Sequence, residues 1–108
     1  MDTNLGEFEQ LVLLALLRLG ENGYGVAVQR EIQRCTRRRI AFGTVYAALA
    51  RLEAKGLAAS RLGDPTPERG GRRKRYFTIL PAGRRAVERT VRAMRRMTQG
   101  IDAAWEGP

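Results

Sequence analysis

The apolar segment over residues 5–19 constrains the fold of this chain more than any other stretch. Asn4 and Glu7 have the spacing of a helix-capping pair, and Gly20 follows the last leucine, so the segment is predicted to form one helix. Its apolar residues cover nearly every side of such a helix: Leu5, Phe8, Leu11, Val12, Leu13, Leu14, Leu16, Leu17 and Leu19. Because a monomer of 108 residues cannot bury all of this surface, we expect part of it, including Leu5 and Phe8, to face another subunit.

The rest of the pattern predicts a mainly α-helical fold with one β-hairpin. The predicted elements are helices over residues 5–19, 24–35 and 42–56, strands over 57–63 and 72–80, and a last helix from 81 to about 105. Three short helices and a hairpin are typical of a winged helix-turn-helix, in which the third helix enters the major groove and the hairpin touches the backbone beside it. We therefore expect a winged-helix DNA-binding domain over residues 1–80 and an added C-terminal dimerisation helix over residues 81–108.

The third helix, FGTVYAALARLEAKGL, has one core face and one face of very small residues. At about 100° per residue, the inward side carries Val45, Leu49, Leu52 and Gly56. The opposite side carries Gly43, Ala47, Ala50 and Ala54, bordered on one edge by Thr44, Arg51 and Lys55 and toward the other by Tyr46. Alanine is the best helix former, which is one plain explanation of this composition. The other explanation is clearance, because small residues let a helix backbone approach the bases in a groove about 12 Å wide.

Two basic clusters flank this helix and favour clearance. The chain has 20 lysines and arginines against 11 acidic residues, a net charge of +9, which favours a polyanionic partner, although genome composition can also raise arginine. The clusters are Arg37, Arg38 and Arg39, and Arg72, Arg73, Lys74 and Arg75. Strand alternation separates Arg72 and Lys74 from Phe77, so we expect these two to contact phosphates at the base of the hairpin loop. Arg38 and Arg39 are expected to do the same, with a solvated charge run as the alternative.

The last helix carries a narrow apolar seam. Its members follow heptad spacing: Val87, Val91, Met94, Thr98, Ile101 and Trp105. Arginines cover the outer face, and Gly100 interrupts the final turn. A second copy of the chain is the simplest cover for such a seam, and attachment to a membrane surface is the alternative. Trp105 is expected to anchor the dimer, or else to line a pocket between subunits for a small apolar or aromatic effector.

The composition argues against several classes of function. The chain has no histidine and one cysteine, Cys35, which lies in the apolar stripe of the second helix and is predicted to be a core thiol. Because no catalytic or metal-ligating set is evident, we expect no enzymatic activity, no metal site and no cofactor. The first apolar run lacks the cationic start of a signal peptide and is too short to span a bilayer, so a cytoplasmic protein without membrane contact is expected.

A set of short motifs follows in order from Leu5 to about Val91. They are LGEFE at residues 5–9, VLLAL at 12–16, YG at 24–25, GTVY at 43–46, LE at 52–53, GL at 56–57, GGR at 70–72 and PAG at 81–83. In this order and spacing, the chain resembles the PadR family of bacterial transcriptional regulators.

The resemblance implies a winged-helix DNA-binding domain with a C-terminal dimerisation helix. It also implies a dimer on a two-fold related operator, usually acting as a repressor. The GTVY motif belongs to the recognition helix in that family, which gives Thr44 and Tyr46 a role on DNA. The sequence departs from the family at Leu80, where a threonine commonly caps the last helix, so the start of that helix is less well defined. The C-terminal part is short, so a large separate ligand domain is not expected.

The expected function is therefore a dimeric, sequence-specific DNA-binding regulator. Its candidate DNA-binding residues are Arg38, Arg39, Thr44, Tyr46, Ala47, Arg51, Lys55, Arg72 and Lys74. Its candidate dimerisation residues are Leu5, Phe8, Val87, Val91, Met94, Ile101 and Trp105. The alternative is an interaction module that keeps the winged-helix shape and uses its basic face on an acidic partner protein.

Overall fold

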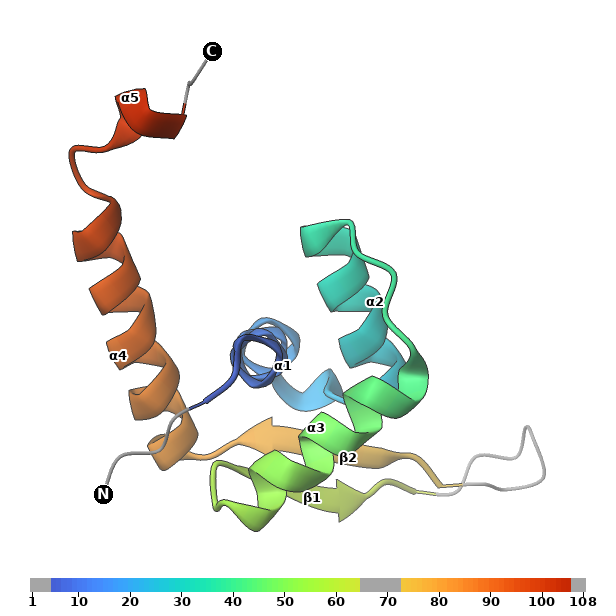
Figure 1. Ribbon diagram of the computed structural model, residues 1–108. Coiled ribbons are helices and arrows are strands. Elements are labelled where there is room, and N and C mark those ends of the chain that lie inside the picture. The colour runs from blue at the N-terminus through green and yellow to red at the C-terminus, as the bar shows by residue number, and fades with distance from the viewer. Residues whose placement is uncertain (1–4, 65–72, 106–108) are drawn as a thin grey trace.

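Helix α1 (Glu7–Leu19) runs through the middle of the molecule, and Figure 1 looks along its axis. The computed structural model describes residues 5–64 and 73–105 of the 108-residue chain. Helix α1 packs against α2 (Gly25–Thr36), α3 (Phe42–Ala54), β2 (Arg75–Ile79) and α4 (Pro81–Thr98), besides the short turn that follows it. Its buried apolar side chains are Val12, Leu13, Ala15 and Leu16, each at most 2% exposed. The core of the molecule is therefore built around α1.

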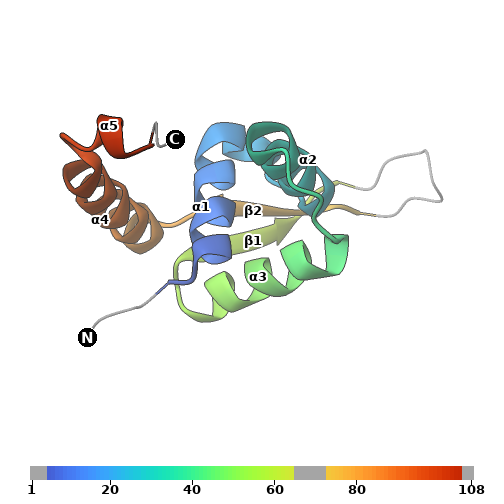
Figure 2. The same cartoon turned by 45° about the horizontal axis from the view of Figure 1, so that its top comes forward.

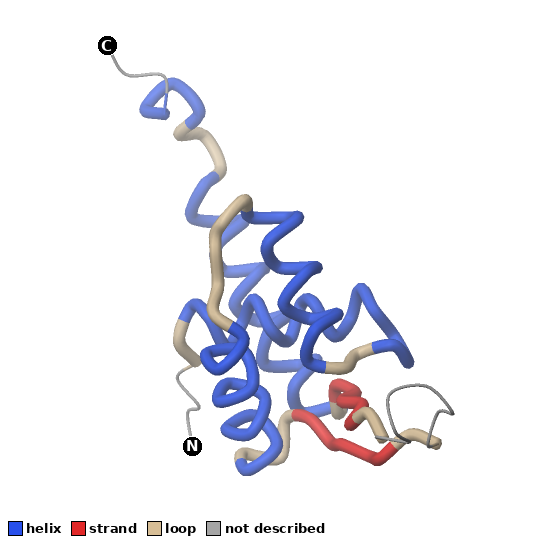
Figure 3. The backbone as a smooth tube through the Cα atoms, turned by 90° about the vertical axis from the view of Figure 1, so that its right-hand side faces the viewer, coloured by secondary structure: helices blue, strands red, loops and turns tan. Residues whose placement is uncertain are grey.

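Three further elements complete the chain. They are the 3-10 turn η1 (Gly20–Asn22), strand β1 (Ala58–Leu62) and the short helix α5 (Asp102–Trp105). The order of the elements confirms the predicted mainly helical fold with one antiparallel hairpin, of the winged-helix type. Figure 2 shows the hairpin passing behind α1 and α2, and Figure 3 shows the C-terminal α5 extending away from the other helices.

The first turn of α1 is closed by a different residue from the one predicted. Gly6 is the N-cap, and its N–H donates a hydrogen bond of 3.2 Å to Glu9 Oε1. Glu9 therefore takes the role that the spacing assigned to Glu7, and Asn4, the predicted partner, lies outside the described residues.

Helix α4 is shorter than predicted. It begins at Pro81, and Leu80 gives no side-chain cap, as expected from the departure at that position. The prediction that the last helix runs to about residue 105 is wrong, because α4 ends at Thr98 and Gly100 turns the chain with a φ of +79° before α5 begins. No helix in the described part of the chain is both long and apolar enough to cross a membrane.

The hairpin is paired along both edges of β2. On one edge, β1 runs antiparallel to β2 in a register from Ala58 opposite Ile79 to Leu62 opposite Arg75. On the other edge, Phe77 N–H donates to the carbonyl oxygen of Gly23 at 2.9 Å. The turn before α2 thus extends the small sheet and fixes the hairpin against that helix. The returning strand begins at Arg75 rather than at residue 72, and residues 65–72 lie outside the described part.

Two residues that were predicted to lie in the core are exposed. Cys35 is exposed on the last turn of α2, and its Sγ is 3.8 Å from Glu31 Oε2. Gly56 follows the end of α3 in a turn with a φ of +75°, so helical periodicity no longer predicts which side of the helix it lies on. Periodicity identified which residues share a face, but not where each helix leaves the core.

Gly83 lets the first turn of α4 pack directly against the chain that enters β1. An added Cβ would collide with the carbonyl oxygen of Leu57, which also accepts a 2.9 Å hydrogen bond from Leu80 N–H. We predict that Gly83→Ala lowers the free energy of unfolding in urea by about 1–3 kcal/mol, the usual cost of overpacking. Gly43→Ala is the control, because a Cβ there meets nothing within 4 Å and should leave stability equal or higher. Equal stability of Gly83→Ala and the wild type would contradict this contact.

Candidate nucleic-acid interface

The outer face of α3 is a strip of small exposed residues, called the small face below. Its members are Gly43, Ala47, Ala50 and Ala54. The inward side buries Val45, Ala48, Leu49 and Leu52, each fully shielded from solvent. The two sides therefore lie where helical periodicity predicts, with Ala48 added to the core. Thr44 is exposed at the N-terminal end of the helix, beside the small face.

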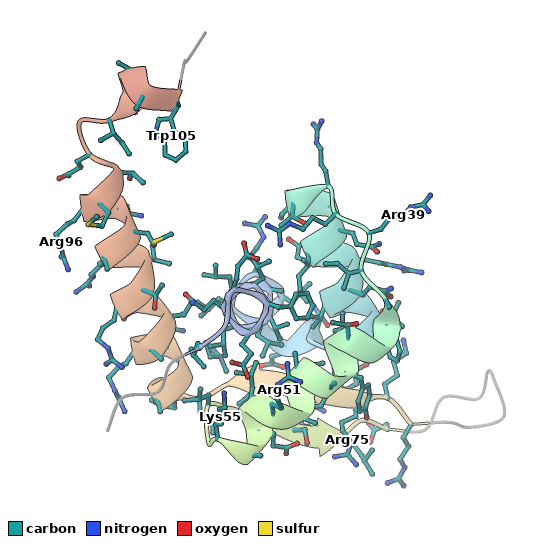
Figure 4. All side chains as sticks on the ribbon, viewed as in Figure 1. Arg39, Arg51, Lys55, Arg75, Arg96 and Trp105 are labelled. Carbon is teal, nitrogen blue, oxygen red and sulfur yellow. The ribbon has the colours of Figure 1, made fainter. Side chains whose placement is uncertain are left out.

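The border of the small face that lies toward α1 is held by a carboxylate. Lys55 Nζ lies 3.1 Å from Oε1 and 2.9 Å from Oε2 of Glu9, and Arg51 Nε donates to the same Oε2 at 3.3 Å. The Glu9 side chain is 8% exposed, whereas those of Arg51 and Lys55 are 53% and 35% exposed. Figure 4 shows Arg51 and Lys55 on the side of α3 that carries this contact.

The charge of Glu9 is stabilised by these contacts. Burial raises the pKa of Glu9, but hydrogen bonds from Lys55, the Gly6 N–H and Arg51 together outweigh burial. The pKa therefore lies below its usual value, and Glu9 is a carboxylate at neutral pH. The sequence predicted that Arg51 and Lys55 border the small face, and gave no sign that both are bound to α1.

The opposite border ties α3 to the hairpin. Arg75 Nη1 donates to Ser60 Oγ at 3.1 Å, and Ser60 Oγ donates to Glu53 Oε2 at 2.7 Å. Tyr46 also lies on this side and is 41% exposed. Its ring centroid is 6.2 Å from that of Phe77 in an edge-on arrangement, so Tyr46 packs partly on the core and presents one side to solvent.

A groove of about 790 Å³ lies where the start of α2, the start of α3 and the hairpin meet. Aromatic and basic side chains predominate in its lining, which consists of Tyr24, Gly25, Val26, Arg30, Phe42, Tyr46, Leu62, Arg73, Lys74 and Arg75. Lys74 Nζ lies 4.2 Å from the centre of the Tyr24 ring, and Tyr24 meets Tyr76 edge to face. The groove thus places four basic residues next to the N-terminal end of α3, where Thr44 also lies.

The sequence missed part of this groove. Strand alternation assigned Arg73 and Arg75 to the face opposite Lys74, yet all three line the groove. The assignment fails because pairing begins only at Arg75, so Arg73 and Lys74 precede the regular strand. Arg30 was not singled out, and Tyr24 was named only as part of the YG motif, although it stands at the N-cap of α2 and lines the groove. The predicted contact Arg72 lies outside the described residues.

The arginines before α3 differ in their surroundings. Arg38 makes a two-pronged ion pair with Glu7 of α1, with distances of 3.0 and 2.9 Å from its two Nη atoms. Arg39 is exposed on the link between α2 and α3, and Figure 4 shows it pointing away from the body of the molecule. The link itself is fixed at Ile40, whose carbonyl oxygen and N–H bond the side chains of Gln29 and Gln33.

The candidate dimerisation residues fall into two groups. Val87 is buried, and Leu5, Phe8 and Val91 pack partly against the core of their own chain. Beyond Val91, α4 leaves the core, and the apolar side chains that remain uncovered are Met94, Met97, Ile101 and Trp105. Their exposed fractions of 39–74% are large for such side chains. Figure 4 shows Trp105 on the inner side of α5, facing the space above α1, and Arg96 on the outer side of α4.

A second, smaller groove lies between α1 and α2. It has a volume of about 320 Å³, and its apolar lining includes Leu11, Leu14, Leu17, Ile32 and Cys35. Beside it, Glu31 pairs with Arg18 and Arg34, whose hydrogen bonds lower the pKa of Glu31 to about 2. Across residues 5–64 and 73–105, no group of three or more cysteine, aspartate or glutamate side chains is arranged to hold a metal ion.

Residues 13–89 of the chain match the model of the transcriptional regulator PadR-like family. The chain is also 39% identical over 98 residues to an uncharacterized 37.1 kDa protein in a transposon of Streptomyces fradiae. That match covers 91% of the chain and 25% of the relative, so the chain spans about a quarter of the length of this curated protein.

Two solved structures are similar in fold over most of their length. A transcriptional regulator from Clostridium thermocellum is 25% identical, with a TM-score of 0.70 over 88% of this chain and 89% of that chain. A PadR family transcription regulator from Clostridium difficile is 22% identical, with a TM-score of 0.72 over 93% and 99% of the two chains.

Proposed function

The chain belongs to the PadR-like family of transcriptional regulators, and from this premise we propose that it binds double-stranded DNA as a homodimer, with α3 in the major groove. The resemblance read from its motifs is thereby confirmed, and the chain is a transcriptional regulator rather than an enzyme. Binding to a specific operator, and repression as its consequence, are the finer parts of the proposal.

The observation that carries the proposal is the small face of α3, with Arg51 and Lys55 on one border and the basic hairpin beyond the other. An α-helix with its side chains is about 10–12 Å across, close to the width of the major groove, so large side chains on the outer face would hold the backbone away from the bases. Ala47 and Ala50 avoid this at the centre of the face. Thr44 and Tyr46 stand at its N-terminal end, where a hydroxyl can reach a base edge or a phosphate.

The groove beside α3 supports the proposed contacts with the DNA backbone. Arg30, Arg73, Lys74 and Arg75 line it within reach of one strand that passes between the hairpin and the start of α2. Such contacts supply affinity that depends on salt and carries no sequence information. The stack of Lys74 on Tyr24 holds the hairpin base in place for this role.

The exposed part of α4 and α5 supports the proposed dimer. Four large apolar side chains, Met94, Met97, Ile101 and Trp105, are uncovered and lie beyond the core of their own chain. A second copy that brings the same residues, together with the apolar groove between α1 and α2, would cover them. A small apolar or aromatic effector against Trp105 stays a prediction of the sequence.

We predict that replacing the small face abolishes operator preference. The wild type should bind duplex from upstream of its own gene at least about 10³-fold more tightly than random duplex. Ala47→Leu should keep the folded circular dichroism spectrum, because Ala47 is exposed. It should lose the preference for the upstream duplex, because the larger side chain would collide with the base edges in the major groove of the DNA. Ala47→Ser, which keeps the face small, is the control. Equal weak binding of the wild type to both duplexes, at every salt concentration, would contradict the proposed function.

We predict that Met94→Asp with Met97→Asp converts the dimer to a monomer in sedimentation experiments at micromolar concentration. Both side chains are exposed, at 61% and 74%, so the fold of the single chain should persist. Arg89→Asp with Arg96→Asp, which places the same two residues on the arginine-covered face of α4, is the matched control and should stay dimeric. A wild type that is already monomeric would refute the proposed interface.

A further inference from the structure

Glu9 is the buried charged residue of the described chain, at 6% exposure, and it is bonded to the helix proposed to read DNA. Its two oxygens accept hydrogen bonds from Gly6 N–H, Arg51 Nε and Lys55 Nζ. Burying a carboxylate is costly unless such partners compensate for lost water. An apolar residue would cover the same site between α1 and α3 without this cost, which points to a role for the charge itself.

Resting on the proposed function, we infer that Glu9 is a specificity-determining residue that keeps Arg51 and Lys55 from acting as general phosphate contacts. Arg51 and Lys55 lie four residues apart on the border of the small face, and both are accessible enough to reach a DNA backbone. The two cations and the carboxylate of Glu9 together have a net charge of +1, whereas the two cations alone would have +2. Their share of the sequence-independent attraction to DNA is reduced accordingly.

The same contact orients Arg51. The bond to Glu9 uses Nε, which fixes one side of the guanidinium and leaves its two Nη atoms without a hydrogen-bond partner among the described residues. A guanidinium held in this way presents a fork that fits the O6 and N7 acceptors of guanine. Glu9 is thus a positioning residue: it acts through Arg51 on the bases, and it withholds Lys55 from the phosphates.

The contact also links the helix proposed to bind DNA, α3, to α1, which packs against the proposed dimerisation helix α4. Glu9 lies on α1, the helix that contacts α4 as well as α3. The border of the small face is therefore held in a fixed position relative to the helix that carries the proposed dimer contacts. A dimer that spaces two α3 helices on DNA requires such a rigid connection.

Glu9→Gln tests the inference, since the amide keeps the volume of the side chain and removes its charge. The plot of log binding constant against log salt concentration for random duplex should steepen by about 0.9 to 1.8, equal to one or two new phosphate contacts. Preference for the upstream duplex should fall. Glu88→Gln, which removes one exposed carboxylate from α4, is the control for net charge and should change neither quantity.

Three outcomes separate the possibilities. A folded Glu9→Gln variant with the wild-type slope and preference would overturn the inference and leave the proposed function intact. A variant that binds both duplexes more weakly at an unchanged slope would also overturn it, since Glu9 would then act on the fold alone. A wild type without preference for either duplex would instead overturn the proposed function.

Lys55→Gln keeps the inference testable if Glu9→Gln fails to fold. Because Glu9 already withholds Lys55 from DNA, removing this cation should leave the salt slope on random duplex unchanged. A slope shallower by about 0.9 would show that Lys55 contacts a phosphate in the wild type and would overturn the inference.

Discussion

The burial of α1 among α2, α3, β2 and α4 is the interaction on which the rest of the molecule depends. Val12, Leu13 and Leu16 are almost completely shielded from solvent, and each such side chain contributes about 1.5–3 kcal/mol by burial. Because one helix holds the other elements, the position of α3 and the direction of α4 are set relative to the same axis. The small face with the basic groove and the start of α4 are thus positioned by the same central helix (Figure 1).

Local periodicity predicted most of the fold. The order of the elements, the buried side of α3 and the exposed Gly43, Ala47 and Ala50 all follow from 3.6-residue spacing and turn residues. Periodicity failed where a helix leaves its neighbours. Cys35 keeps the phase of an inward residue but lies on a turn that extends past the core, and the seam of α4 ends at Thr98 because Gly100 adopts a left-handed conformation. In both cases the spacing identified the correct side of the helix, but the prediction overestimated how far along the helix that side is packed or continues.

The candidate site was less predictable than the fold, because its polar contacts join residues distant in sequence. Arg51 and Lys55 were placed correctly on their border, but their partner Glu9 lies 42 and 46 residues away on α1. The groove at the hairpin base depends on Tyr24 pairing with Tyr76, which brings the start of α2 to the edge of β2. No spacing within one element reveals such contacts. They change the interpretation of the basic residues, since Arg38, Arg51 and Lys55 are each paired with a carboxylate of α1.

Dimethyl sulfate footprinting tests most directly whether the small face of α3 enters the major groove, since the reagent methylates guanine N7 there. The DNA for this measurement is selected from random duplexes by binding to the wild-type protein, so no operator need be known beforehand. If α3 of each subunit occupies the major groove, guanine N7 atoms are protected in two tracts with centres about 10–10.5 base pairs, or a multiple of this, apart. Tight binding that leaves every guanine N7 as reactive as in bare DNA would contradict a role for the small face in reading the bases.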